Sequence, residues 1–209
     1  MLTLALDTAL DHCQAALVSD GAVIAHAASA ARGDAEAIDG HVGDVLASAA
    51  VPMARIDRVA VTLGPGSFTG VRVGIAYAKG MGLALGVPVA GLSTLHVIAA
   101  QHGAPAIAAI DARHGAVFAG IWSDTQKPAE QEARITLEAC LALAEERVLP
   151  LAGPPSAIAA LGCGAVVERL DLSVLAGLFP VGTSGPALTA RYLAPVDAAP
   201  QTHKALARA

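Results

Sequence analysis

The chain has 209 residues, which is enough for one sizeable hydrophobic core or two modest lobes. Hydrophobic residues make up 55% of it and aromatic residues 3%, so we expect a folded protein whose core is filled mainly by Ala, Val, Leu and Gly. The formal net charge of −5 disfavours tight nucleic-acid binding by this chain alone, because such affinity comes mostly from Lys and Arg side chains that neutralise phosphates.

Membrane, secreted and disulfide-rich classes are also disfavoured. The longest stretch without a formal charge, 80–110, is interrupted by Pro, His and several Gly residues, unlike a membrane span. No basic segment precedes Asp7, which predicts a cytoplasmic protein without a signal peptide or a membrane segment. Cys13, Cys140 and Cys163 form no CxxC pair, and we expect them to be small core residues.

The first half of the chain predicts a β-meander followed by alternating helices and strands. Asp20-Gly21 is a strong two-residue hairpin signal between two apolar runs. Asp34 is placed to N-cap a helix that extends to Ala50. The predicted strands are 2–8, 14–19, 22–29, 58–63 and 88–92, and the further helices are 71–86 and 94–101.

The second half repeats the beginning of the first. Asp111 and Asp124 follow Asp7 and Asp20 at one constant interval, the first of each pair ending a strand and the second in the following hairpin. Helices are predicted over 137–146, 156–161 and 172–178, and strands over 148–152 and 165–169.

These elements predict an α/β protein of two lobes, 1–102 and 103–209. Each lobe has a largely buried sheet with an antiparallel hairpin at its edge. From about residue 181 the pattern weakens, and we assign no function to the tail over 198–204.

The most distinctive segment is 64–74, GPGSFTGVRVG, a glycine-rich turn between a predicted strand and a helix. Such a turn can cradle a phosphate with its backbone amides. It fits neither phosphate fingerprint, because Thr69 occupies the third glycine position of G-x-G-x-x-G and no Gly-Lys-Ser/Thr follows. Phosphate binding and a tight structural or docking turn both remain open, whereas Ser67 lacks the G-x-S-x-G context of a serine hydrolase.

The helix after this turn has a stripe of small residues. Interior Gly residues cost about 1 kcal/mol each relative to Ala, so close packing against another backbone must offset them. We expect a partner helix to cover the stripe; the alternative is the chain's own helix over 34–50. The stripe consists of Gly70, Gly74, Ala78, Gly82 and Gly86.

Two strand-end carboxylates are candidates for chemistry. Asp7, with Thr8, and Asp111 could bind Mg²⁺ or act as a general base, or could cap the following turns. The seven histidines contain no HExxH and no H-x₃-H pair, so spacing predicts no metal site. His41, His96, His102 and His114 are each expected to be surface or core histidines.

Four segments together resemble the bacterial TsaB (YeaZ) family: LALDTA over 4–9, GPGSFTGVRVG over 64–74, GLSTL over 91–95 and AIDAR over 109–113. The likeness covers 1–123, with a faint echo at Tyr192-Leu193. It implies the duplicated fold of the sugar kinase, heat-shock ATPase and actin superfamily. It also implies a part in making N6-threonylcarbamoyladenosine in tRNA.

Within that system the resemblance implies a non-catalytic subunit that pairs with the metal-dependent transferase TsaD and works with the ATPase TsaE. It implies tRNA contact through the complex, no cofactor in the isolated chain, and ATP or ADP at most at the complex interface. Whether the free chain is a monomer or a homodimer is left open. The residues we assign to partner binding are Gly70, Val71, Gly74, Ala78, Gly82 and His41.

The departures from the TsaD pattern support this subunit role. The H-x₃-H metal pair of TsaD-like proteins is reduced to His41, so we expect no metal. Asp111 is followed by Ala112-Arg113 instead of a glycine, and the adenosine-side glycines are reduced to Gly162-Cys163-Gly164. We therefore assign no cofactor-binding residues and interpret the phosphate loops near Asp7, Thr8 and Asp111 as degenerate. The alternatives are an ATP-dependent phosphotransferase and an M22-like glycoprotease.

Overall fold

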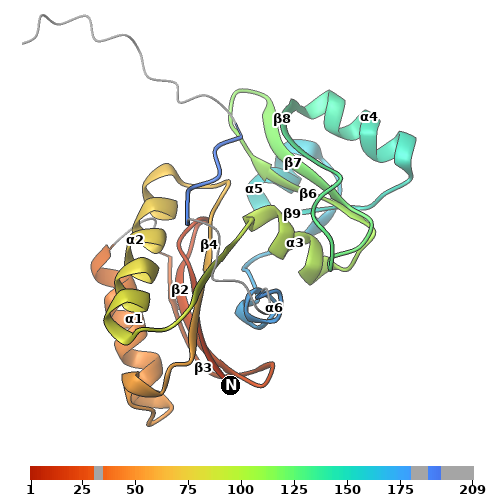
Figure 1. Ribbon diagram of the computed structural model, residues 1–209. Helices are drawn as coiled ribbons and strands as arrows, with labels where there is room; N and C mark the ends of the chain where they lie inside the picture. The colour runs from red at the N-terminus through yellow and green to blue at the C-terminus, as the bar shows by residue number, and fades with distance from the viewer. Residues whose placement is uncertain (31–34, 180–187, 194–209) are drawn as a thin grey trace, which may run out of the picture.

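The computed structural model describes residues 1–30, 35–179 and 188–193. Within them the chain forms two five-stranded mixed sheets, ordered β3-β2-β1-β4-β5 and β10-β9-β6-β7-β8. If the strand order of the second sheet is read backwards, from β8 to β10, it matches that of the first sheet. In each sheet the central strand has an antiparallel hairpin on one side and parallel neighbours on the other. The predicted duplication into two lobes, each with a mixed sheet flanked by helices, is confirmed (Figure 1).

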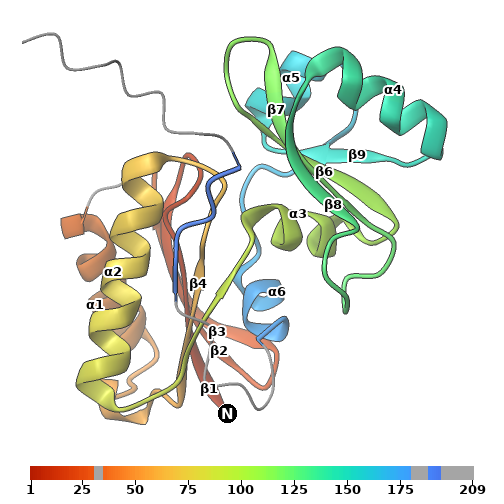
Figure 2. The ribbon, with the colours of Figure 1, turned by 45° about the horizontal axis from the view of Figure 1, so that its top comes forward.

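The first sheet contains β1 (Leu2–Asp7), β2 (Cys13–Ser19), β3 (Ala22–Ser29), β4 (Arg58–Thr62) and β5 (Val89–Leu92). Helices α1 (Ala35–Ser48) and α2 (Phe68–Leu85) lie together on one face of this sheet (Figure 2), and a 3-10 turn, Met53–Arg55, precedes β4. Asp20 and Gly21 have φ values of 50° and 85°, as a tight hairpin turn between twisted strands requires. The predicted N-cap Asp34 lies outside the described residues.

The second sheet contains β6 (Ala106–Asp111), β7 (Ala116–Trp122), β8 (Gln131–Thr136), β9 (Leu151–Gly153) and β10 (Ala165–Val166). Helices α4 (Leu137–Arg147) and α5 (Pro155–Leu161) pack on it. The halves exchange their remaining helices: α3 (Thr94–His102) packs on β6 and β7, and α6 (Leu172–Gly177) packs on β1 and β2. The domain boundary between 102 and 103 stays a prediction, because each of these two helices packs on the sheet of the other half of the chain.

Three local predictions differ from the structure. No strand was predicted where β8 lies, because its sequence QEARIT is polar and half-exposed at the sheet edge. The strand predicted over 148–152 begins later, since Val148 caps α4 in the left-handed conformation with a φ of 53°. The strand predicted over 165–169 is limited to Ala165 and Val166.

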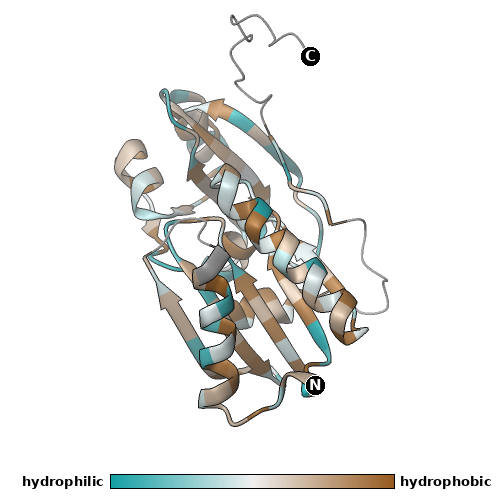
Figure 3. Cartoon of the chain, turned by 90° about the vertical axis from the view of Figure 1, so that its left-hand side faces the viewer, coloured by the Kyte–Doolittle hydropathy of each residue, from teal (hydrophilic) through white to brown (hydrophobic). Residues whose placement is uncertain are grey.

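Apolar side chains form three clusters, and one of them joins the lobes. It places Ala5 and Ala16 of the first sheet with Ile110 and Trp122 of the second, around α3 and α6. The other two lie under α1 and α2, and under α4 and α5. Figure 3, which looks onto α1 and α2, shows hydrophilic and hydrophobic residues mixed along both helices.

The three cysteines do not share one environment. Cys13 and Cys140 are buried, as predicted, whereas Cys163 is exposed after the end of α5, contrary to the expectation of a core residue. In the part of the chain that the structure describes, no helix combines the length and the apolar character needed to cross a membrane.

Candidate functional site

The glycine-rich turn between β4 and α2 is packed against the loop after β1. The Ser67 amide donates to the Ala9 carbonyl oxygen at 2.7 Å, and a Cβ atom on Gly66 would overlap that oxygen. The Ser67 hydroxyl N-caps α2 by accepting a hydrogen bond from the Gly70 amide at 3.2 Å. These amides are already used inside the chain, which favours the structural interpretation of the turn over a phosphate cradle.

The stripe of small residues on α2 faces the chain's own first sheet. A Cβ atom on Gly70 would overlap the Thr8 carbonyl oxygen, and one on Gly74 would overlap the Thr8 hydroxyl. A Cβ atom on Gly82 would overlap a methyl group of Val89 on β5. The five α2 residues assigned to partner binding are all buried in the single chain: Gly70, Val71, Gly74, Ala78 and Gly82.

These contacts contradict the expectation that the stripe faces a partner helix. The close backbone approach inferred from the sequence is present, but it joins α2 to the end of β1 and to β5 of the same chain. Glycine is needed there because the helix lies so near the sheet that no side chain fits between them.

His41, the remaining residue assigned to partner binding, is half-buried on α1. Its Nε2 atom lies 2.9 Å from the Ser29 hydroxyl, which links α1 to β3. A docking role for His41 stays a prediction. Among residues 1–30, 35–179 and 188–193, no three His, Cys, Asp or Glu side chains are grouped so as to hold a metal ion.

Asp7 is a buried structural carboxylate with 1% exposure. Its Oδ1 accepts hydrogen bonds from the Thr62 hydroxyl at 2.6 Å and the Ala9 amide at 3.0 Å, and its Oδ2 accepts one from Gln14 at 3.3 Å. Burial raises the pKa of the Asp7 carboxyl, against these hydrogen bonds, which lower it. The neighbouring Thr8 hydroxyl donates to the Gly70 carbonyl oxygen at 2.7 Å. Both residues therefore hold β1, β4 and α2 together.

Asp111, the equivalent residue at the end of β6, also caps its own turn. Its Oδ1 accepts a hydrogen bond from the Arg113 amide at 2.8 Å. Arg113, His114 and Gly115 then follow with φ values of 60°, 52° and 69°, three successive left-handed residues. The Arg113 carbonyl oxygen accepts a hydrogen bond from Arg134 on β8 at 3.4 Å. Turn capping, one of the two roles considered for each aspartate, is what the structure favours at both strand ends.

A cavity of about 520 Å³ lies between the lobes, where these turns meet. The first lobe contributes the loop after β1 and the glycine-rich turn, and the second contributes the loop after β6 and the start of α5. Polar groups line it together with apolar ones: Asp11, Ser67, Thr69, Asp111, Arg113 and Ser156, and Leu10, Phe68, Ile110, Phe118 and Pro154. Asp7 does not line this cavity, so its carboxylate is not offered to a ligand there.

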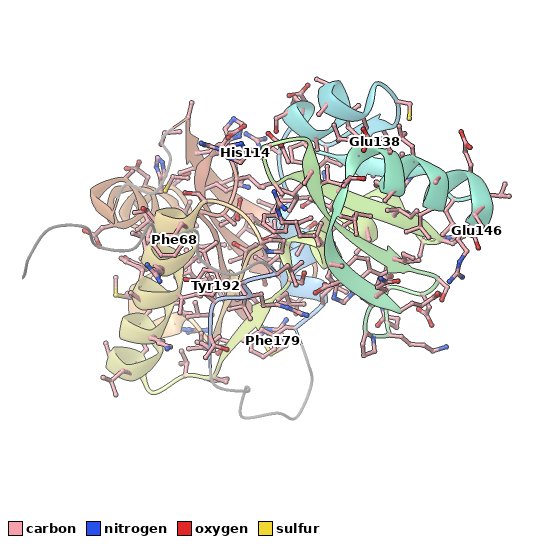
Figure 4. The ribbon with its side chains drawn as sticks, turned by 90° about the horizontal axis from the view of Figure 1, so that it is seen from above. Phe68, His114, Glu138, Glu146, Phe179 and Tyr192 are labelled. Atoms are coloured by element: carbon pink, nitrogen blue, oxygen red, sulfur yellow. The ribbon has the colours of Figure 1, made fainter. Side chains whose placement is uncertain are left out.

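An exposed aromatic and cationic cluster lies at the rim of this cavity. The Arg72 guanidinium is 3.5 Å from the centroid of the Phe68 ring, which itself lines the cavity. The Tyr192 ring lies 5.7 Å from the Phe68 ring, between centroids, and 5.6 Å from the Arg72 guanidinium. In Figure 4, Phe68 of α2 and Tyr192 lie near each other. We call Phe68, Arg72 and Tyr192 the rim cluster.

Tyr192 is held there by the segment 188–193, which contacts both lobes. The Arg191 amide donates to the Leu63 carbonyl oxygen at 2.8 Å, next to the glycine-rich turn. The Arg191 side chain pairs with Glu132 of β8 at 2.5 Å, and that carboxylate is 6% exposed. The sequence predicted no structure for this segment, because its contacts are all with residues distant in the chain; the signal present was the faint likeness at Tyr192-Leu193.

The chain has two duplicated lobes, each with a mixed sheet and an edge hairpin, and the turns after the two central strands form the cavity between them. This arrangement defines a protein of the actin-like ATPase fold. The predicted fold class is confirmed. A crystal structure titled YeaZ from Pseudomonas aeruginosa matches with a TM-score of 0.67 and 26% identity, covering 85% of this chain and 89% of that one.

The family model described as TsaD, tRNA N6-adenosine threonylcarbamoyltransferase, matches residues 25–179, and the chain belongs to this family. The Escherichia coli tRNA threonylcarbamoyladenosine biosynthesis protein TsaB is 40% identical over 132 residues, 61% of this chain and 56% of the relative. The Haemophilus influenzae TsaB is 36% identical over 120 residues, 55% of this chain and 51% of the relative. The chain spans about half the length of the curated relatives it matches. These matches confirm the resemblance to the TsaB (YeaZ) family.

Proposed function

We propose that this protein is a non-catalytic subunit of the assembly that forms threonylcarbamoyladenosine in tRNA, and that it docks onto a TsaD transferase. TsaE, and tRNA held through the complex, are the further partners of this proposal, and the cytoplasm is its location. The observation that carries it is the state of the strand-end carboxylates. Asp7 is 1% exposed with both oxygens engaged, and Asp111 caps its own turn.

The same observation weighs against the two alternatives. An ATP-dependent phosphotransferase needs a carboxylate that can reach the metal or the attacking hydroxyl group. Both oxygens of the Asp7 carboxylate instead accept hydrogen bonds from Thr62, Ala9 and Gln14. An M22-like glycoprotease needs a set of metal ligands, and His41 instead pairs with Ser29. If ATP or ADP binds, this proposal confines it to the interface with the transferase.

The docking face is the outer surface of α1 and α2, opposite the buried stripe. Gly40 and Gly43 on α1 and Gly80 on α2 are exposed, and a Cβ atom at each would meet nothing within 4 Å. Among the residues that the structure describes, no contact compensates the helix-propensity cost of these three glycines, about 1 kcal/mol each. Leu83 on the same face of α2 is 87% exposed. A partner helix that approaches closely would account for both features.

The charges on this face are complementary between the two helices. Asp39 and Asp44 are exposed on α1, and Arg72 and Lys79 are exposed on α2. A paralogue or a second copy with a similar helix pair, related by a two-fold axis, would place acidic α1 against basic α2. This supports docking to a protein of the same fold, either TsaD or a second copy of the chain.

Reconstitution tests the proposal. The chain with the threonylcarbamoyl-AMP synthase but without TsaD should leave tRNA unmodified, and addition of TsaD should give modified tRNA and a co-purifying complex. Modification without TsaD would refute the non-catalytic role. Absence of any complex with the TsaD of the same cell would refute the docking role.

A further inference from the structure

We infer that the rim cluster is a stacking platform for an unpaired base of an RNA loop. The inference rests on the proposed function for the identity of the RNA, and on the chemistry of Phe68, Arg72 and Tyr192 for the kind of ligand. It concerns a surface beside the proposed docking face, at the first turn of α2, where the two lobes meet.

The exposure of the aromatic side chains is the first observation. The chain has three Phe, two Tyr and one Trp residues, all in the described part. Phe68 and Tyr192 are the exposed ones, at 46% each, and they are in contact with each other. Two large π faces exposed side by side, in a chain so poor in aromatics, are unexplained by core packing. Bases in single-stranded loops stack on such rings and on guanidinium planes such as that of Arg72.

The platform is preorganised by its surroundings. Tyr192 is fixed by the hydrogen bond from the Arg191 amide to Leu63 and by the ion pair of Arg191 with the buried Glu132. Leu188 and Ala190 pack against the apolar cluster of the first lobe. The rings therefore lose little freedom when a ligand stacks on them.

The charge around the cluster differs from that of the whole chain. Although the net charge is −5, exposed arginines gather here: Arg72 in the cluster, Arg113 in the adjoining cavity, and Arg134 bonded to the Arg113 carbonyl. Asp11 and Asp111 lie in the cavity, and the Asp111 carboxylate is engaged by the Arg113 amide. Aromatic rings beside arginines suit a planar base on an anionic backbone. Aromatic residues and Arg are also enriched in protein interfaces, so the test below includes TsaD binding as the outcome that would assign the cluster to protein docking.

The experiment uses an anticodon stem-loop RNA with 2-aminopurine in its loop, added to the assembled complex of this chain with TsaD. Phe68→Leu and Tyr192→Leu keep apolar volume and remove the π face. We expect each to weaken RNA binding about tenfold and to reduce the fluorescence quenching that stacking causes. Arg72→Gln should lower the slope of log affinity against log salt by about 1. Complex formation with TsaD and the melting temperature should be unchanged in the two ring variants. The salt slope of Arg72→Gln is measured on the isolated chain, because the Arg72 charge also lies on the proposed docking face.

Leu83→Ala is the matched control, because Leu83 is on the docking face of the same helix. It should weaken association with TsaD and leave quenching by the isolated chain intact. Unchanged RNA affinity in both ring variants would overturn the inference. Loss of TsaD binding in Phe68→Leu would also overturn it, by assigning the cluster to protein docking. Displacement of the RNA by an equal concentration of ATP would overturn it in favour of a free nucleotide.

The outcome can be separated from that of the proposed function. If the unmodified chain does not bind TsaD, the proposed function fails, and the isolated chain at high concentration still tests the platform. If the isolated parent chain quenches 2-aminopurine and the isolated Phe68→Leu variant does not, the stacking site is supported. Equal quenching by the parent and the variant would overturn it.

Discussion

Two sets of small residues on α1 and α2 resemble each other in the sequence but have opposite surroundings. Gly70, Gly74 and Gly82 face the first sheet so closely that a single Cβ atom would overlap it. Gly43 and Gly80 have open space around the position of a Cβ atom. The inner set is explained by the fold of the single chain. Glycine at the outer positions lowers helix stability, and no described contact within the chain requires it there. These positions therefore point to a partner.

The largest effect is expected from filling the inner set. In Gly74→Leu the side chain must displace Thr8 of the neighbouring strand end. Overpacking of this kind costs about 3 kcal/mol, more than the gain of about 1 kcal/mol in helix propensity. Urea unfolding of the free chain should show the loss, and a variant as stable as the parent would mean that the stripe is not buried.

A smaller loss is expected where the segment 188–193 meets β8. Arg191→Ala leaves the buried Glu132 carboxylate without its cation and should cost about 1–2 kcal/mol, reduced from the value for a fully buried pair because Arg191 is 46% exposed. Glu132→Gln added to Arg191→Ala should restore part of the loss. If the loss of stability in the double variant equals the sum of the losses in Arg191→Ala and Glu132→Gln, the two side chains are not coupled.

The buried carboxylate at the end of β1 should give a pH dependence. Burial raises the pKa of Asp7 above 3.8 in the folded state, so the folded chain binds this proton more tightly than the unfolded chain does. The free energy of unfolding should therefore fall as pH rises above 3.8 through the folded-state pKa, by at most about 1.4 kcal/mol per pH unit. Asp7→Asn should remove this component; an unchanged slope would assign it to another group.

The smallest expected effect is a difference in reactivity among the three cysteine thiols. Burial, followed by the proximity of Cys163, raises the pKa of the Cys140 thiol to about 11, so at neutral pH about one molecule in ten thousand carries the thiolate. Iodoacetamide should label the exposed Cys163 in the folded chain and leave Cys13 and Cys140 unmodified, as read by peptide mass spectrometry. In Cys163→Ser, labelling should require denaturant. Rapid labelling of Cys140 in the folded state would contradict its burial.

Much of the fold could be predicted because its signals are local or repeated. The Asp20-Gly21 hairpin, the strand-end aspartates and the helix after the glycine-rich turn all follow from residues close together in the chain. The polar edge strand β8 was missed because half of its surface is exposed and its apolar alternation is weak.

The candidate site was less predictable, because it depends on which surfaces meet. Spacing by four residues identifies a close-packed seam on α2 but does not say which neighbour fills it, and the neighbour is the sheet below. Tyr192 joins Phe68 through a segment whose contacts with Leu63 and Glu132 are tertiary. No local pattern could have placed it.

The most direct test of the account compares two neighbouring glycines of α2 in a pull-down with the TsaD of the same cell. Gly80→Leu should keep or raise the stability of the free chain, by up to about 1 kcal/mol, and should abolish association. Gly82→Leu should lower the melting temperature of the free chain, because the side chain overlaps Val89. A Gly80→Leu chain that remains folded and binds TsaD as tightly as the parent would contradict the assignment of the outer face of α1 and α2 to docking.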